Sequence, residues 1–302
     1  MIYTVTMNPA IDYVVGLSSP FQPGKTNRSH WEQCQFGGKG INVSMVLQAL
    51  DCETTALGFV AGFTGEALEQ NLQAQGLATQ FLHLSHGLTR INVKIKDGQE
   101  SEINGRGCTI SPEDLHNLYK QLDRLTDGDL LVLSGSVPPG LSADAYRSIM
   151  AHVSPKNIPV VVDASGALLE QTLSCKPFLV KPNLDELEHL LGKTATDEAE
   201  LCSMAKTLQT RGARNVLVSL GADGALLLDE TGTFHRIHCP KGDAVNTVGA
   251  GDSMVAGFLA GYLQTGDYLH SLRLATAAGC ATAFCPGLAQ KDQILSLMGS
   301  FT

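Results

Sequence analysis

Positive charge is scarce in this sequence of 302 residues, which has 21 lysines and arginines against 30 aspartates and glutamates. The formal net charge of −9 argues against a basic face that binds nucleic acid. An anionic substrate would need lysine and arginine side chains gathered at its site, because the field of the whole chain opposes its approach. Any such cluster of cations therefore indicates a binding site.

Long apolar runs are also missing from the sequence. No stretch approaches the ~18 apolar residues of a membrane-spanning helix. The first residues, MIYTVTMNPA, lack the charged start and apolar core of a signal peptide, so we expect a cytoplasmic protein without a membrane partner. With 43% hydrophobic residues, the chain can still bury a large core, in one large α/β domain or two smaller ones.

Paired cysteine motifs are absent, although the chain has 8 cysteines. There is no C-x-x-C pair, and the 9 histidines form no H-E-x-x-H motif, so the sequence offers no recognisable zinc site. We expect every cysteine, including Cys239 and Cys280, to be a free thiol in a reducing compartment.

The two common nucleotide fingerprints are missing as well. GKT occurs at 24–26 and 192–194, but Ser19 and Leu187 stand where a Walker A motif requires glycine. The segments GAGDSM and GKGINV end in Met254 and Val43 rather than in the last glycine of G-x-G-x-x-G. A dinucleotide-dependent oxidoreductase is therefore not supported.

What the sequence does contain is a regular alternation of short β-branched runs with helical patterns. Strands are predicted at 2–6, 55–60, 129–135, 158–164, 177–183 and 214–221, and helices at 40–50, 65–75, 111–125, 142–152, 183–192, 197–210, 252–263 and 267–284. Several strands are continuously apolar, as expected of parallel strands covered on both faces. The pattern predicts a doubly wound, mainly parallel α/β sheet flanked by helices, with ligands bound at the carboxyl ends of its strands.

Three segments alternate polar and apolar residues with no helix between them, namely 11–15, 27–36 and 88–107, the last around the hairpin turn Asp97-Gly98. They predict a small half-exposed β-sheet built from about 11–36 and 88–107, separate from the core. It is either a lid over the strand ends or a pair of surface hairpins.

A glycine turn opens the helix in NTVGAGDSMVAGFLAGYL, and such a turn is a ready anion site. Asp252 lies in its first turn, where it is either a helix N-cap or a group that lies beside a bound anion. The small residues Ala256, Gly257, Ala260 and Gly261 predict a neighbour packed closely against this helix.

A second glycine turn, QFGGKGIN, places Gly38, Lys39 and Asn42 at the start of another helix. It is either an anion site with a hydroxyl-binding amide or a tight turn with a solvated lysine. Asp12 follows a strand end, where it either accepts hydrogen bonds from sugar hydroxyls or stabilises a turn. Arg90 and Asn92 share one strand face, and Arg90 suits a phosphate, but exposure on the surface is the commoner role of a lone Arg90 or Lys25.

The stretch VKPNLDEL contains Lys181, Asn183 and Glu186 at the end of a strand. Asn183 and Glu186 either form a capping box or hold Mg²⁺ through its waters. The stretch VSLGADGALLL, at 218–228, predicts a hairpin whose turn could lie along a nucleotide.

In this order, GGKGIN, KPN with Glu186, VSLGADGA and VGAGDSMVAGF resemble the ribokinase-like (PfkB) carbohydrate kinases over essentially the whole chain. YTVTMNPAIDY, TRIN and SGSVPPG are most similar to the branch containing phosphofructokinases and tagatose-6-phosphate kinases. The resemblance implies a single kinase domain over 1–302 that converts D-fructose 1-phosphate and ATP to D-fructose 1,6-bisphosphate. Phosphorylation of tagatose 6-phosphate and a silent sugar-phosphate-binding regulator are the alternatives.

The resemblance also implies residue roles. Asp252 would be the catalytic base beside an anion hole at Gly249, Ala250 and Gly251. The sugar phosphate would be held by Asp12, Lys25, Gly38, Lys39, Asn42, Arg90 and Asn92. The nucleotide would be held by Lys181, Asn183, Ser219, Leu220, Gly221, Ala222, Asp223, Gly224 and Gly251, with Mg²⁺ at Asn183 and Glu186.

Members of this family often dimerise through the lid sheet, which implies a homodimer here. Asn246 stands where much of the family has an aspartate that contributes to a monovalent-cation site in some relatives. The resemblance therefore does not carry potassium dependence over to this chain.

Overall fold

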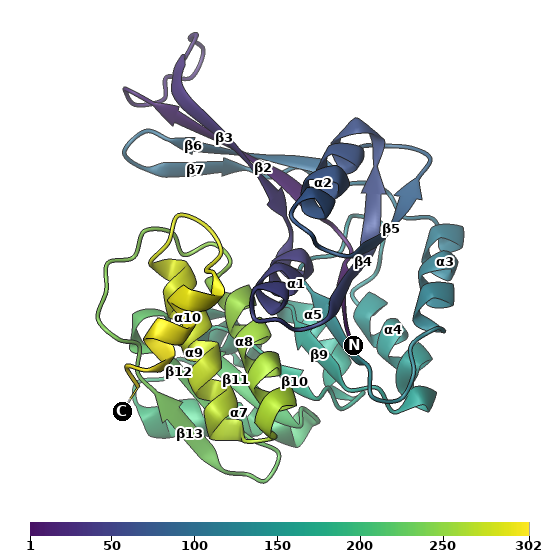
Figure 1. Cartoon of the computed structure of the whole chain (residues 1–302), viewed down its shortest axis with the longest axis vertical. Helices are drawn as coiled ribbons and strands as arrows, with labels where there is room; N and C mark the ends of the chain where they lie inside the picture. The colour runs from purple at the N-terminus through teal and green to yellow at the C-terminus, as the bar shows by residue number, and fades with distance from the viewer. Residues whose placement is uncertain (302) are drawn as a thin grey trace.

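A nine-stranded sheet forms the centre of the computed structural model, which describes residues 1–301 (Figure 1). Its strand order is β13-β12-β11-β10-β9-β8-β1-β4-β5. The strands are β1 (Ile2–Thr6), β4 (Thr54–Ala61), β5 (Thr79–Leu84), β8 (Leu130–Ser134), β9 (Val160–Asp163), β10 (Leu179–Val180), β11 (Asn215–Ser219), β12 (Ala225–Leu228) and β13 (Phe234–Ile237). Only β12 and β13 run antiparallel to their neighbours, so the predicted mainly parallel sheet is confirmed.

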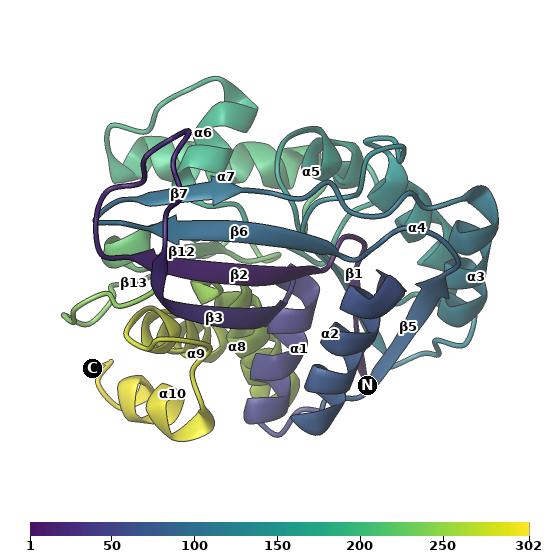
Figure 2. The same ribbon diagram turned by 90° about the horizontal axis from the view of Figure 1, so that it is seen from above.

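Helices cover both faces of this sheet (Figure 2). One face carries α3 (Pro112–Leu122), α4 (Ala145–Val153), α5 (Gly166–Leu173), α6 (Leu184–Leu191) and α7 (Glu198–Arg211), and the other carries α1 (Lys39–Ala49), α2 (Gly62–Ala74), α8 (Ala250–Thr265), α9 (Tyr268–Ala283) and α10 (Lys291–Met298). Alternate strand side chains supply the two layers: Leu131 and Leu133 pack into one buried cluster, Leu130 and Val132 into the other. Within residues 1–301, no helix combines the length and apolarity needed to cross a membrane.

A second sheet projects from the main body, as predicted, and we call it the lid sheet (Figure 1). It consists of β2 (Ala10–Leu17), β3 (Ser29–Gly37), β6 (Arg90–Lys96) and β7 (Glu100–Ile103) in the order β3-β2-β6-β7. The predicted turn at Asp97-Gly98 joins β6 to β7. Because β1 ends at Thr6 and β2 begins at Ala10, the lid sheet starts at the carboxyl end of the main sheet.

The close neighbour predicted for the small face of α8 is α9. A Cβ atom added at Gly257 would lie 2.5 Å from the carbonyl oxygen of Leu274, and one at Gly261 would lie 2.8 Å from Cα of Ser271. The glycines therefore let two largely buried helices pack backbone to backbone, and this packing fixes the position of the first turn of α8.

Four elements and one covalent bond differ from the sequence predictions. The helices α5 and α10 have only 8 residues each, and the strands β5 and β13 are half exposed, so none has a strong periodic pattern. Cys239 and Cys280 form a disulfide, so the expectation of free thiols is wrong for these two. Their Cα atoms lie 6.5 Å apart because the chain after β13 returns to α9, a contact over 41 residues that no cysteine motif indicates. The other cysteines are free.

Candidate functional site

A cavity of about 790 Å³ lies between the carboxyl ends of the main sheet and the inner face of the lid sheet. Most residues singled out in the sequence line it: Asp12, Gly38, Lys39, Asn42, Arg90, Asn92, Lys181, Asn183, Glu186, Ser219, Gly249, Gly251 and Asp252. Asn246 lines it as well. The lid interpretation is therefore favoured over decorative hairpins, since lid residues form one wall of the cavity.

The first turn of α8 presents free backbone N–H groups to this cavity. Gly249 is the N-cap with φ 83°, a left-handed conformation that favours glycine, and it provides no side-chain cap. The N–H of Ala250 donates to the carbonyl of Thr247 at 3.2 Å, whereas the N–H groups of Gly251 and Asp252 have no partner among residues 1–301. Unpaired N–H groups at a helix N-terminus attract an anion.

Asp252 is the third residue of α8, so the interpretation as a helix N-cap is wrong. Its side chain is buried, and its carboxylate accepts a hydrogen bond from Nδ2 of Asn42 at 2.8 Å. Burial, and then the negative charge of Asp163, raise the pKa of Asp252 to about 7, although Lys39, Asn42 and Lys181 oppose the shift. A carboxylate with such a pKa can take up a proton near neutral pH.

The turn before α1 brings the second glycine motif to the same place. Gly38 has φ 144°, and a Cβ atom there would lie 2.7 Å from Cγ2 of Thr6. Thr6 Oγ1 also accepts the N–H of Ile41 at 3.0 Å, which anchors α1 at the end of β1. The bond from Asn42 to Asp252 therefore joins the N-termini of α1 and α8.

Asp163 is a site residue that the sequence reasoning missed. It ends β9 with no exposed surface, and its Oδ1 lies 3.4 Å from Nζ of Lys181 and 3.6 Å from Nζ of Lys39. Burial alone would raise the pKa of Asp163, but the two ammonium groups hold it below its usual value. The available signal was a carboxylate at the carboxyl end of an otherwise apolar strand, IPVVVDA.

The lid side of the cavity carries Arg90 and Asp12. Nε of Arg90 donates to the carbonyl of Asn8 at 3.2 Å, and the terminal guanidinium nitrogens have no partner within residues 1–301. Burial lowers the pKa of Arg90, and the Asp12 carboxylate opposes that shift. Arg90 and Lys39 also line an adjoining cavity of about 310 Å³ at the ends of β8 and β9. An anion bound to them could therefore extend into either cavity.

The nucleotide residues predicted after β10 are held rigidly. Asn183 caps α6: its Oδ1 accepts the N–H of Glu186 at 2.7 Å, while Oε2 of Glu186 accepts the N–H of Asn183 at 3.0 Å. This capping box leaves the second oxygen of Glu186 free of protein partners in the described chain. Lys181 Nζ lies only 3.0 Å from where a Cβ atom of Gly251 would be, so it stands directly beside the first turn of α8.

Three groups of predicted residues lie outside the cavity lining. Lys25 is exposed in the turn between β2 and β3, so it does not lie with Lys39 and Arg90 as the family resemblance implied. Ala250 does not line the cavity, and Leu220, Gly221, Ala222, Asp223 and Gly224 form the turn between β11 and β12 beside Ser219. Lys181 is the third cation that does line the cavity.

Comparisons with known proteins agree with this geometry. The model of the pfkB family of carbohydrate kinases matches residues 2–294. The chain is 44% identical to a 1-phosphofructokinase of Bacillus subtilis, over 99% of this chain and 97% of the relative. It is 37% identical to a D-tagatose-1-phosphate kinase of Bacillus licheniformis, over 97% and 96% of the two chains. It superposes on phosphofructokinase-2 from Escherichia coli, solved with substrates and products, with TM-score 0.92, 28% identity and 99% of each chain covered.

Proposed function

Because the chain belongs to the pfkB family of carbohydrate kinases, we propose that it transfers the terminal phosphoryl group of ATP to D-fructose 1-phosphate, giving D-fructose 1,6-bisphosphate. One observation carries the proposal: Asp252, with its raised pKa, lies beside unpaired helix N–H groups in the cavity that also contains Arg90. The match to the relative from Bacillus subtilis supports the choice of substrate. The whole chain, lid sheet included, acts as one kinase unit.

Asp252 acts as the general base in this proposal. Its carboxylate takes the proton of the attacking sugar hydroxyl, which lies between Asp252 and the transferring phosphoryl group. The unpaired N–H groups of Gly251 and Asp252 in the turn capped by Gly249 then face the phosphoryl oxygens and stabilise their charge. A negative side chain at an anion site is thereby explained, because the hydroxyl separates the two charges.

The acceptor is held mainly from the lid. Arg90 and Lys39 pair with its phosphate, since a guanidinium matches phosphate oxygens and neither cation is fully satisfied by the protein. Asp12, Asn42 and Asn92 contact sugar hydroxyls, and Gly38 lets the sugar approach the backbone. Lys25 reaches the acceptor only if the turn between β2 and β3 moves toward the cavity.

The nucleotide lies along the opposite wall, from Lys181 and Asn183 to Ser219 and the turn that follows β11. Lys181 pairs with its phosphates beside Gly251, where the absence of a side chain leaves room. The free oxygen of Glu186 and the amide oxygen of Asn183 are hard ligands suited to Mg²⁺ held through waters. When bound with ATP, Mg²⁺ supplies neutralising charge at the phosphates.

A second acceptor is favoured by the relative from Bacillus licheniformis, whose name gives D-tagatose 1-phosphate as its substrate. Tagatose and fructose differ in the configuration of one hydroxyl, while the 1-phosphate is common to both. The same cations would serve either sugar, so discrimination falls to the hydroxyl-binding residues Asp12, Asn42 and Asn92.

A coupled assay of ADP release tests the proposal across fructose 1-phosphate, tagatose 1-phosphate, fructose 6-phosphate, tagatose 6-phosphate and free fructose. We expect the highest kcat/KM with fructose 1-phosphate and a very low value with free fructose. A higher kcat/KM with either tagatose phosphate would make that sugar the substrate in place of fructose 1-phosphate. Equal turnover of free fructose would overturn the role of the cations.

We also propose that the protein is a homodimer formed through the outer face of the lid sheet. Ile103, with 64% of its surface exposed, lies there with the apolar side chains of Tyr13, Val15, Ile91, Val93 and Ile95. An apolar sheet face of this kind is typical of an interaction surface. Sedimentation velocity should show a dimer that Ile103→Glu weakens. Leu263→Glu, a change at an exposed residue of α8, should leave it intact.

A further inference from the structure

Lys94 is a buried lysine that no part of the proposed mechanism uses. It lies in the middle of β6, two residues after Asn92 on the inner face of the lid sheet, and its side chain is only 8% exposed. It does not line the cavity. Lysine is almost never buried unless it is paired, so its contacts indicate what it is for.

The ammonium group of Lys94 lies between two carboxylates from the neighbouring strands. Its Nζ is 3.2 Å from Oδ2 of Asp12 on β2 and 3.4 Å from Oε1 of Glu102 on β7. Burial alone would lower the pKa of Lys94, but Asp12 and Glu102 together raise it, so the lysine remains charged.

The other oxygen of Asp12 is held by a different residue. Nδ2 of Asn92 donates to Oδ1 of Asp12 at 2.8 Å, and Oδ1 of Asn92 in turn accepts the N–H of Gly105 at 3.1 Å. Each carboxylate oxygen of Asp12 therefore has its own partner, which fixes the plane of the group, and Asp12 still lines the cavity with lone pairs left to accept from a ligand.

A cation behind Asp12 also solves an electrostatic problem. An acceptor that carries a phosphate is repelled by a carboxylate in its own site, and the net charge of −9 adds to that repulsion. Lys94 neutralises this locally without taking the place of a sugar hydroxyl, because it contacts Asp12 but does not itself line the cavity.

We propose that Lys94 is a positioning residue for the acceptor: it orients Asp12 and compensates its charge, so that Asp12 can bind the hydroxyls of an anionic sugar. The inference rests on the proposed function, since it requires Asp12 to contact the sugar phosphate. It makes Lys94 a determinant of acceptor affinity that acts through Asp12.

The first experiment compares Lys94→Met, Lys94→Arg and Lys96→Met in steady-state kinetics. Lys94→Met should raise KM for fructose 1-phosphate about tenfold, the effect of losing a charged hydrogen bond, with KM for ATP unchanged. Lys94→Arg keeps the charge and should recover most of the loss. Lys96→Met removes the exposed lysine that follows on the same strand and should change neither constant. A normal KM for fructose 1-phosphate in folded Lys94→Met would overturn the proposal.

A double-mutant cycle with Asp12→Asn separates positioning from general support of the lid sheet. If Lys94 acts through Asp12, Lys94→Met should change KM less than about twofold in the Asp12→Asn background. An undiminished effect in that background would contradict the proposal. If Asp12→Asn alone leaves KM unchanged, the assignment of Asp12 to the acceptor fails, and the inference fails with it.

Glu102→Gln provides a test that does not depend on the folding of Lys94→Met. It removes the other carboxylate partner but keeps the contact between Lys94 and Asp12. KM for fructose 1-phosphate within about twofold of the parent supports positioning through Asp12, because that ion pair is intact. A rise as large as that of Lys94→Met would show that Lys94 only anchors the hairpin, and would overturn the proposal.

Discussion

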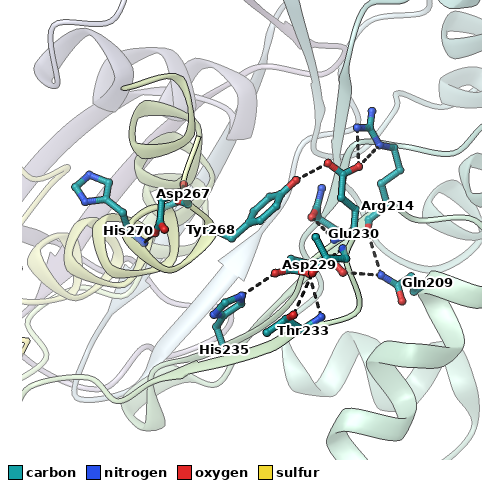
Figure 3. A network of polar contacts seen from close by, with 12 residues as sticks. Gln209, Arg214, Asp229, Glu230, Thr233, His235, Asp267, Tyr268 and His270 are labelled. Atoms are coloured by element: carbon teal, nitrogen blue, oxygen red, sulfur yellow. Dashed lines mark hydrogen bonds and ion pairs between the residues drawn. The ribbon is translucent and has the colours of Figure 1, made fainter. Parts of the chain in front are cut away.

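Asp252 and Asp229 are almost equally buried, at 5% and 3% exposure, yet their pKa values move in opposite directions. Asp229, directly after β12, accepts hydrogen bonds from Thr231, Thr233 and His235 (Figure 3). These bonds hold its pKa below the usual value, although burial alone would raise it. Asp252 accepts one hydrogen bond, from Asn42, and its pKa rises. Burial and the neighbouring negative charge of Asp163 prevail at Asp252, whereas hydrogen-bond donors prevail over burial at Asp229.

Two arginines repeat this contrast. Nε of Arg214 donates to Oε2 of Glu230 at 2.7 Å, and Nη2 lies 2.6 Å from the same oxygen (Figure 3). The guanidinium also lies over the ring of Phe178. Arg90 makes one backbone hydrogen bond and keeps its terminal nitrogens toward the cavity. At the β12–β13 edge, polar side chains have protein partners, and the hydrogen bond from Tyr268 to Glu230 joins this edge to α9. At the carboxyl ends of the main sheet, polar side chains without protein partners in the described chain are available to a ligand.

The largest expected effect separates the two aspartates. Asp252→Asn keeps the size of the side chain but cannot accept a proton, so kcat should fall by about 10²–10⁴. Above pH 7 the variant should be at least as stable as the parent, because burial disfavours the charged carboxylate. Asp229→Asn is the matched control and should leave kcat unchanged. A folded Asp252→Asn protein with nearly normal kcat would contradict the assignment of the base.

The pH profile of the parent enzyme tests the raised pKa of Asp252. The base must be ionised to accept a proton, so kcat/KM should fall about tenfold for each pH unit below about 7. Initial rates with fructose 1-phosphate between pH 5 and 8 measure this limb. A flat profile over that range would show that Asp252 is already ionised in the free enzyme.

The two arginines should give smaller and opposite effects: Arg90 on substrate affinity, Arg214 on thermal stability. Arg90→Ala should raise KM for fructose 1-phosphate about tenfold or more, with KM for ATP and Tm little changed, because it removes a charged hydrogen bond to the phosphate. Arg214→Ala should instead lower Tm and leave both KM values unchanged. Equal weakening of both substrates in Arg90→Ala would argue against its place in the acceptor site.

Stability changes complete the series. Asp229→Asn removes a charged acceptor of several hydrogen bonds and should cost about 1.5–3 kcal/mol at neutral pH. Because the folded pKa of Asp229 is depressed, its contribution is present above the unfolded value and is lost as pH falls through the folded one. Urea unfolding at pH 7 and pH 3 should therefore show a smaller difference between variant and parent at pH 3. A constant difference would contradict linkage to this group.

The features that depend on neighbouring residues, namely strands, turns and helix starts, could be predicted from the sequence. Continuous apolar strands such as LLVLS predicted the parallel sheet, and alternation around Asp97-Gly98 predicted the lid sheet. The glycine turns predicted where α1 and α8 begin, and they also indicated Gly38, Asn42 and Asp252 as candidate site residues. These features depend on backbone preference and side-chain period, which neighbouring residues already determine.

What was missed depends on contacts between distant segments. Asp163 pairs with Lys181, which follows β10, and Lys94 pairs with Asp12 on β2. No spacing in the sequence indicates either pair. The family resemblance placed Lys25 with the sugar phosphate, but it belongs to an exposed turn. The bond from Cys239 to Cys280 likewise depends on where the chain passes α9.

The hydrogen bond between Asn42 and Asp252 joins positions 210 residues apart. During synthesis the residues proposed for the acceptor, Asp12, Asn42 and Arg90, leave the ribosome long before α8 does. A chain that stops before α8 lacks both the proposed base and the helix that completes the buried core around α1. If Asp252 is the base, chemistry begins only when the segment from Ala250 onward has folded, so incomplete products cannot spend ATP.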